Sequence, residues 1–184
     1  MPTRKKSAAP DVTADADIER MFRHPGFLIR RAQQVAVSSF IDHYGHHGIT
    51  PTQSALLKIV QHSPGVDQVG AGRMLGLDRT TAATSVATLA AEKLLERRND
   101  PNDGRRRTLF ITSKGEKLLA KIGDMRESGE TMLSVFSADE ARTFLRLLDH
   151  FVTSSNANVR IPMEPVPAGR RTRAVAARKK NATG

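Results

Sequence analysis

The chain has 184 residues, about the size of one domain, and carries a formal net charge of +10 at pH 7. It contains no Cys, which excludes disulfides and zinc-thiolate sites and is compatible with a reducing cytoplasm. No apolar run reaches the roughly 18 residues that a membrane span needs, and no apolar h-region follows the opening MPTRKKSAAP. We therefore expect a cytoplasmic protein with no signal peptide and no membrane partner.

The positive charge is concentrated at the ends of the chain. Residues 1–16 hold three basic and two acidic residues, giving +1, and residues 159–184 hold seven basic and one acidic, giving +6. Only +3 remains for residues 17–158. This balance favours a polyanion as partner; the alternative is that the basic tail only keeps the protein in solution.

The first third of the chain predicts helices. Residues 1–16 have too little apolar surface to offset the entropy of ordering, so we expect them to be disordered. A short helical turn is expected at 18–22, and apolar residues at helical spacing predict a long helix over 27–45. The pair Thr50-Pro51 is typical of an N-cap and first helical residue, and it starts a further helix that ends before Pro64-Gly65.

Residues 67–93 predict a helix-turn-helix. A short helix over 67–75 is followed by Gly76, which tolerates a positive φ, and by Asp78, whose carboxylate can cap the next helix. That second helix extends to about Lys93 and has a narrow apolar face. Its other face is expected to point outward and carries Arg79, Thr80, Ala83, Thr84 and Thr88.

Two strand-like runs follow, at 94–98 and 107–112. The segment that joins them is dense in turn-forming residues, and residues 99–107 carry two Asp and three consecutive Arg. A helix followed by such a basic β-hairpin, or wing, is typical of a protein that places the helix in a DNA groove.

The remaining chain predicts two amphipathic helices and a tail. An S-x-x-E capping box at 113–116 starts a helix with a heptad-like seam up to Phe136, and a second box at 137–140 starts the last helix. These helices either cover their own domain or form a dimer interface. We favour the dimer, because a DNA reader usually needs two half-sites. The tail at 159–184 is predicted to be disordered and able to contact phosphates, or else is an artificial extension.

Three stretches, ITPTQSALLKIV, LGLDRTT and LLERRNDPNDGRRRTLFITSKG, closely resemble the MarR family of winged-helix regulators. The resemblance covers roughly residues 26–155, and its most specific motif is Asp103-x-Arg105 followed by Leu109-x-Ile111-Thr112-x-x-Gly115. It implies a mainly α fold with a small antiparallel β-wing (α+β) and a homodimer joined through its N- and C-terminal helices. It also implies repression from a pseudopalindromic double-stranded DNA operator, with release by a small molecule; some members activate instead.

The domain boundaries follow from the same resemblance. A disordered segment covers 1–16, a MarR-like domain covers 17–158, and a disordered basic tail covers 159–184. Within the domain, the winged helix-turn-helix spans about 48–112, and the dimerisation helices span about 18–46 and 113–158.

The resemblance also implies which residues contact DNA. Arg105 matches the family's minor-groove arginine and Asp103 the acid that orients it, in keeping with the strong negative potential of a narrow groove. Arg106 and Arg107 are phosphate contacts or else a solvated strand end. Further contacts to phosphates and base edges are expected from Arg79, Thr80, Thr81, Thr84 and Ser85.

Some positions depart from the family pattern. Members commonly have a long basic side chain where this chain has Thr84 and a bulkier residue in place of Ala83, so direct base readout is expected to be sparse. Ala71 and Gly72 stand where Leu and Ala are usual, which predicts a loosely packed supporting helix. Lys93 replaces a frequent Gly.

An effector site is expected on the first long helix. A carboxylate or phosphate would need a cation, and an aromatic ring would suit Phe40 or Tyr44. The segment HPGFLIRRAQQ resembles members that control aromatic-acid catabolism, which implies an aromatic carboxylate or its CoA thioester. The candidate ligand residues are Arg30, Arg31, Gln34, Phe40, His43 and Tyr44. The alternative is that the arginines are ordinary surface residues and the histidines ordinary loop residues.

Enzyme motifs are not found in the sequence. It has no nucleophile elbow, no Gly-rich phosphate loop before a helix and no H-E-x-x-H pair, so neither an enzyme nor a cofactor is expected. We assign no metal site, although His43, His46, His47 and Asp42 leave a metal-responsive regulator open. A second alternative is an architectural DNA-binding protein that tolerates many sequences.

Overall fold

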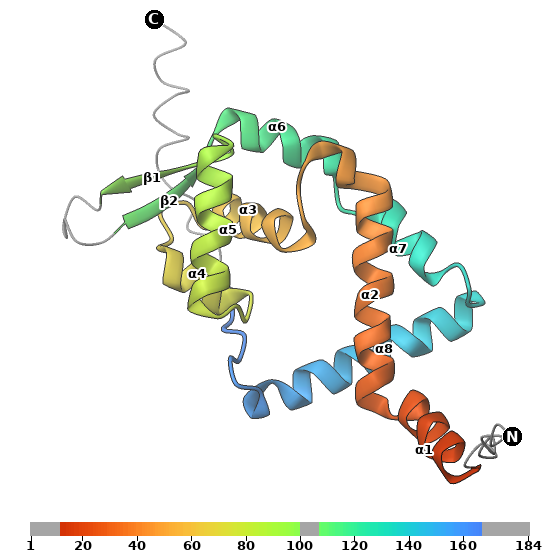
Figure 1. Cartoon of the computed structure of the whole chain (residues 1–184). Coiled ribbons are helices and arrows are strands. Elements are labelled where there is room, and N and C mark those ends of the chain that lie inside the picture. The colour runs from red at the N-terminus through yellow and green to blue at the C-terminus, as the bar shows by residue number, and fades with distance from the viewer. Residues whose placement is uncertain (1–11, 100–106, 167–184) are drawn as a thin grey trace, which may run out of the picture.

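The computed structural model describes residues 12–99 and 107–166 (Figure 1). In this part the fold is mainly α with one two-stranded antiparallel sheet, which confirms the predicted fold class. The elements in chain order are α1 (Val12–Arg23), α2 (Pro25–Tyr44), η1 (Gly45–His47), α3 (Pro51–His62), α4 (Gln68–Met74), α5 (Arg79–Ala91), β1 (Leu95–Asn99), β2 (Arg107–Ile111), α6 (Ser113–Ile122), α7 (Arg126–Leu133), α8 (Ala138–Ser155) and η2 (Asn156–Asn158).

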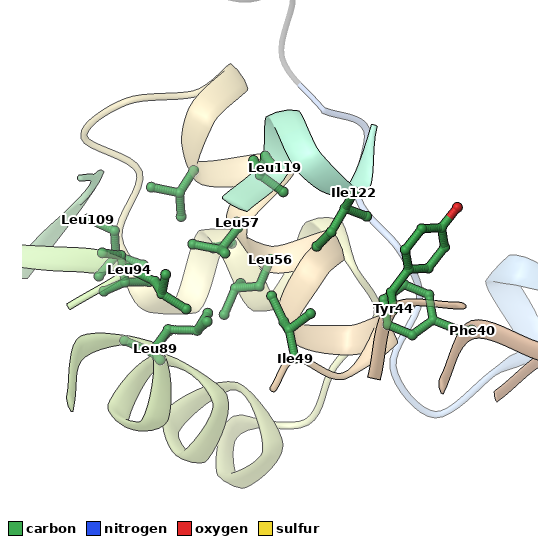
Figure 2. Close-up of a cluster of buried hydrophobic side chains, with 14 residues drawn as sticks. Phe40, Tyr44, Ile49, Leu56, Leu57, Leu89, Leu94, Leu109, Leu119 and Ile122 are labelled. Carbon is green, nitrogen blue, oxygen red and sulfur yellow. The ribbon is translucent and has the colours of Figure 1, made fainter. Parts of the chain in front are cut away.

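Helix α3 lies at the centre of a lobe that also contains α4, α5, α6 and the sheet. It begins with a capping box, in which the Thr50 hydroxyl accepts from the Gln53 N–H and the Gln53 side chain accepts from the Thr50 N–H. Its Leu56, Leu57 and Val60 are fully buried. Side chains from α5, β1, β2 and α6 close around them (Figure 2). Each such leucine contributes about 1.5–3 kcal/mol of burial, so this cluster fixes where α5 and the sheet stand.

The sheet is anchored in the core at one end and exposed at the other. In the antiparallel register Leu95 lies opposite Ile111, and Asn99 opposite Arg107. Leu95 and Leu109 are buried, whereas Arg97, Arg98, Asn99 and Arg107 are exposed. The inner half therefore belongs to the core and the outer half projects as a wing (Figure 1).

Helices α1, α2, α7 and α8 stand beside this lobe (Figure 1). Helix α2 begins at Pro25, which is tolerated as the first helical residue, with His24 as its N-cap. Burial in α2 is confined to Ser39, Phe40 and Tyr44 near its C-terminal end, where α7 packs against it. Most of the rest of its apolar stripe is exposed, as is most of that of α8.

The predicted continuous helix from 113 to 136 is wrong. The chain breaks after Ile122, because Gly123 and Met125 both adopt a positive φ, at 61° and 63°. Two helices, α6 and α7, replace one. The predicted capping box at 113–116 is also displaced, since Thr112 is the N-cap and accepts from the Gly115 N–H. The box of Ser137 and Glu140 at α8 is confirmed, with both of its hydrogen bonds present.

Parts of both terminal segments that were predicted to be disordered have defined structure, whereas the domain boundaries themselves stay a prediction. Helix α1 begins at Val12, inside the segment predicted to be disordered. Residues 159–166, predicted to belong to a disordered tail, pack against α4 instead. Residues 1–11 and 167–184 lie outside the described part of the chain. None of the helices described is both long enough and apolar enough to cross a membrane.

Candidate nucleic-acid interface and effector site

The helix-turn-helix is built from α4, a turn at Gly76 and α5. Gly76 has a φ of 62° and ends α4, as predicted. The Asp78 carboxylate then accepts from the Thr81 N–H at 2.9 Å and from the Thr81 hydroxyl at 2.6 Å. The hydroxyl bond, followed by the backbone bond, lowers the pKa of Asp78 below its ordinary value. The charged carboxylate is thereby held at the N-terminus of α5, where the helix dipole favours it.

Helices α4 and α5 approach each other closely, which corrects the expectation of a loosely packed supporting helix. A Cβ on Gly72 would lie only 2.9 Å from the Cβ of Ala82, and Ala71 is fully buried. The small residues at 71 and 72 therefore permit close packing between the two helices. Loose packing was expected because these residues are smaller than those usual in the family. A small residue leaves a gap only if the neighbouring helix stays at the same distance, and here that helix moves closer.

The two faces of α5 are divided as the sequence predicts. Ala82, Val86 and Leu89 point into the core, while Arg79, Thr80, Thr84 and Thr88 form the outer face. This outer face carries hydroxyls, methyls and one guanidinium. These groups can bond phosphates and meet base edges.

Two of the predicted DNA contacts on α5 need correction. Ser85 is buried, with only 9% of its surface exposed, because it lies on the same face as Ala82 and Val86. The family resemblance suggested a DNA contact at this position, but the side chain belongs to the inner face of α5. Thr81 is exposed, but its hydroxyl already bonds Asp78 and acts as part of the cap.

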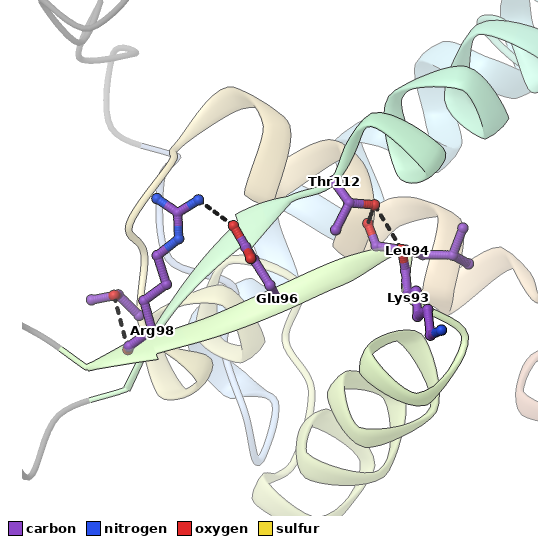
Figure 3. Close-up of polar contacts among 6 residues, drawn as sticks. Lys93, Leu94, Glu96, Arg98 and Thr112 are labelled. Carbon is purple, nitrogen blue, oxygen red and sulfur yellow. Dashed lines mark hydrogen bonds and ion pairs between the residues drawn. The ribbon is translucent and has the colours of Figure 1, made fainter.

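The root of the wing is organised by Thr112 (Figure 3). Its hydroxyl lies 2.7 Å from the Lys93 carbonyl oxygen and 3.1 Å from that of Leu94, and it accepts from the Gly115 N–H at 3.1 Å. A Cβ on Gly115 would lie 2.2 Å from the Leu94 oxygen. The Thr-x-x-Gly motif thus has a physical basis, because only glycine lets α6 begin directly against the chain that leaves α5.

The exposed half of the wing carries the arginines. Arg98 stacks on the Phe110 ring, with its guanidinium carbon 4.3 Å from the ring centroid, and forms an ion pair with Glu96 (Figure 3). Arg107 is exposed at the start of β2. The predicted contacts Asp103, Arg105 and Arg106 lie outside the described residues.

A cleft of about 490 Å³ lies between α5 and β1. It is lined by two basic side chains that the sequence analysis did not include among the candidate site residues. Lys93 and Arg97 line it together with Ala87, Ala90 and Thr112. Strand alternation places Arg97 on the same side of the sheet as Leu95, facing α5. The alternation of side chains along the strand could have identified Arg97 from the sequence, but the three consecutive arginines at 105–107 drew attention to the other strand.

The predicted effector residues on α2 separate into two groups. Arg30, Arg31 and Gln34 are exposed, and the Arg31 guanidinium donates to the side-chain oxygen Oε1 of Gln34 at 3.0 Å. Phe40 and Tyr44 are only 4% and 5% exposed and belong to the hydrophobic core beside Ile49 and Ile122 (Figure 2). They are therefore core residues in this chain, and we remove them from the candidate ligand set.

His43 joins α2 to α7. Its Nδ1 lies 2.7 Å from the Ser39 carbonyl oxygen and its Nε2 lies 3.1 Å from the Thr131 hydroxyl. Ser39 adds a parallel contact by donating to the Ser128 carbonyl oxygen at 2.8 Å. His43 is half-buried, so one edge of this polar junction stays accessible to a ligand.

The loop histidines lie close together in η1. The rings of His46 and His47 are 3.9 Å apart, and desolvation, followed by the charges of His46 and Lys121, lowers the pKa of His47. Across residues 12–99 and 107–166, no three His, Asp or Glu side chains gather closely enough to hold a metal ion.

This arrangement defines a class of protein: a winged helix-turn-helix DNA-binding protein with an exposed α5 and a basic wing. Comparisons with known proteins narrow the class. The profile described as MarR family matches residues 47–106. The transcriptional regulator HosA of Escherichia coli O111:H- is 32% identical over 103 residues, which cover 54% of this chain and 75% of HosA.

Solved structures of transcriptional regulators have the same fold as this chain. The probable transcriptional regulator from Pseudomonas aeruginosa has a TM-score of 0.66 at 30% identity, covering 70% of this chain and 96% of that one. The PcaV transcriptional regulator from Streptomyces coelicolor, in complex with its natural ligand, has a TM-score of 0.65 at 31% identity. The match covers 81% of this chain and 99% of the PcaV chain. The chain belongs to the MarR family and is a DNA-binding transcriptional regulator.

Proposed function

We propose that this chain is a ligand-responsive repressor that binds a pseudopalindromic operator as a homodimer and is released by a small aromatic acid or its CoA thioester. We assign it no catalytic activity and place it in the cytoplasm. The observation that carries the proposal is an exposed apolar surface beside the winged lobe. Leu28 and Val35 of α2 are 54% and 52% exposed, and Phe151 and Val152 of α8 are each 51% exposed.

Apolar side chains exposed in this number on two helices are typical of an interface. A second copy of the chain is the partner that we propose, because a symmetric pair would bury these faces and present two α5 helices to two half-sites. The family resemblance supports the same assembly through the N- and C-terminal helices.

The proposed DNA contacts combine described residues with the wing motif. Arg79, Thr80 and Thr84 supply contacts from α5, and Arg107 supplies one from the wing. Asp103, Arg105 and Arg106 remain proposals that rest on the D-x-R motif. Because α5 has a single guanidinium and no other long cation on its outer face, we expect groove shape and dimer spacing to contribute much of the specificity.

The proposed effector site uses the cations of α2. Arg30 and Arg31 would bind the carboxylate, and the half-buried His43 ring would lie at the edge of the site. PcaV, with a ligand in its structure, supports a small-molecule site in a chain of this fold. A ligand bound between α2 and the lobe would act by favouring one separation of the two α5 helices over another.

Sedimentation equilibrium tests the assembly. We expect twice the mass of one 20.1 kDa chain at micromolar concentration. Phe151→Glu would place a charge on the proposed interface and should shift the equilibrium to the monomer. Asp149→Glu, a conservative change on the same helix, is the matched control. A wild-type protein that stays monomeric would contradict the proposal.

Thermal-shift screening tests the effector. A ligand that binds only the folded protein raises its melting temperature. At a concentration one hundred times its Kd, such a ligand increases the free energy of unfolding by about 2.7 kcal/mol. Aromatic acids and their CoA thioesters are the probes, and any hit is then tested for release of a bound operator. Arg30→Ala and Arg31→Ala should reduce the shift. A hit that stabilises the protein without releasing DNA would contradict the proposed release.

A further inference from the structure

The chain after α8 turns back to the helix-turn-helix (Figure 1). We name residues 156–166 the strap. At its start the Asn156 side-chain amide accepts from the Met163 N–H at 2.9 Å and donates to the Met163 carbonyl oxygen at 3.0 Å. These two bonds close a loop of the strap and fix Met163.

The middle of the strap lies on the turn between α4 and α5. A Cβ on Gly76 would lie 3.0 Å from the Met163 Cγ and 3.3 Å from the Ile161 carbonyl oxygen. Gly76 therefore serves two purposes, since it adopts a positive φ and also leaves room for the strap. Ile161 lines a cleft of about 380 Å³ together with Leu77, Asp78 and Arg79, at the point where α5 begins.

The end of the strap bonds the last turn of α4. The Glu164 N–H donates at 3.0 Å to the Arg73 carbonyl oxygen, which also accepts from the Gly76 N–H. Carbonyls at a helix C-terminus lack partners within the helix, and the strap adds a second donor to this one, beside the Gly76 N–H of the turn. The Glu164 carboxylate lies 3.5 Å from the Arg73 guanidinium, but both side chains are more than half exposed and the pair contributes little.

We infer that the strap is a positioning element for DNA binding, which holds the α4–α5 turn and so sets where α5 stands. Its contacts reach the turn through one backbone bond, from Glu164 to Arg73, and through Gly76, where a Cβ would press against the Met163 side chain. The strap also connects the C-terminal end of α8 directly to the turn. A change in the position of α8 is therefore transmitted to the helix that reads DNA. The inference rests on α5 as the reading helix.

Two matched pairs of variants test the strap in the full-length protein. Glu164→Pro removes the N–H that bonds Arg73, whereas Glu164→Ala keeps it and removes the same charge. Asn156→Ala removes the clamp on Met163. Its control is Asn158→Ala, because the Asn158 side chain makes no hydrogen bond within residues 12–99 and 107–166. The probe is a duplex that the wild-type protein selects from a random-sequence library.

We expect Glu164→Pro and Asn156→Ala to weaken binding to the selected duplex about three- to tenfold, with both controls within about twofold of wild type. Without DNA, the Gly76 and Leu77 amides should exchange about tenfold faster in the two test variants, while the α6 amides are unchanged. This second readout separates a loosened turn from a general loss of stability. If Glu164→Pro does not fold, the Asn156 pair decides the outcome.

Unchanged affinity in both test variants would overturn the inference, and so would equal losses in test and control variants. Unchanged exchange at Gly76 and Leu77 would show that the strap does not hold the turn in the DNA-free protein, which would also overturn the inference. A wild-type protein that selects no duplex would instead contradict DNA reading by α5. The two failures are therefore distinguishable.

Discussion

At the scale of single residues, Lys93 occupies a conformation that favours glycine. Its φ is 59°, its N–H donates to Ala90 and the following N–H donates to Leu89, which is the hydrogen-bond pattern of a Schellman motif ending α5. A non-glycine residue in this region costs about 1 kcal/mol. The family's frequent glycine at this position therefore has a backbone reason.

Lys93→Gly should stabilise the protein by about 0.5–1 kcal/mol, because it relieves that strain. Lys93→Ala is the control, since it removes the same charge and keeps the positive φ. Urea denaturation of both variants measures the difference. Equal stability of the two variants would mean that Lys93 is not strained.

Gly115 is constrained by space. Gly115→Ala would press a Cβ against the Leu94 carbonyl oxygen and should destabilise the protein by about 1–3 kcal/mol or more. Gly129→Ala in α7 is the matched helical control, because no atom of the described chain beyond its own helix lies within 4 Å of the added Cβ. We expect that control to be neutral or slightly stabilising. A small effect at 115 would contradict the close approach at the wing root.

Some residue assignments could be predicted from the sequence and others could not. Asp78 was predictable as a cap because an N-cap acts on neighbours along the chain. Phe40 and Tyr44 were not predictable as core residues, because their burial depends on α7 and on Ile122. Periodicity gives the face of a helix but not which distant element covers it.

At the scale of elements, the cap of α5 makes stability depend on pH. The pKa of Asp78 is lower in the folded protein than its ordinary value. Its carboxylate therefore stabilises the fold at pH values above about 4, and this stabilisation is lost as the pH falls through the lower folded-state pKa.

Asp78→Asn should flatten the pH dependence of the free energy of unfolding between about pH 5 and about pH 3, because the amide accepts hydrogen bonds without titrating. Thr81→Val removes the hydroxyl that contributes most to the shift and should flatten the profile in part. Denaturant titrations across this range measure the effect. An Asp78→Asn profile that is parallel to wild type would exclude the cap as its source.

Local sequence signals predict where helices start but not every place where a helix ends. Thr50, Asp78 and Ser137 start their helices as predicted, because each cap is a local hydrogen bond. The break between α6 and α7 was missed, because the apolar spacing continues across it. Gly123 was the only local sign, and a single glycine inside a periodic pattern is compatible with a continuous helix.

At the scale of the whole molecule, the lobe and the apolar helices could both be predicted from the sequence, but the path of the chain after α8 could not. The strap residues have no periodicity and resemble the tail that follows them. The charge of that tail still favours a role in phosphate binding, because Arg170, Arg171, Arg173, Arg178, Lys179 and Lys180 lie beyond residue 166.

A chain that ends at residue 166 keeps the strap and tests the tail alone. It should bind selected and random duplexes more weakly by the same factor. The salt dependence of log Kd should become shallower by about 0.9 for each phosphate that the tail neutralises in the full-length protein. Titrations of both duplexes at several salt concentrations measure this. Weaker binding confined to the selected duplex would contradict a purely electrostatic tail.

In the proposed complex, two copies of this chain place two α5 helices on one operator. Hydroxyl-radical footprinting of the selected duplex tests it most directly. We expect two equivalent protected half-sites, related by two-fold symmetry and centred about one helical turn, roughly 34–36 Å, apart. A single protected half-site, or uniform protection along the duplex, would contradict it.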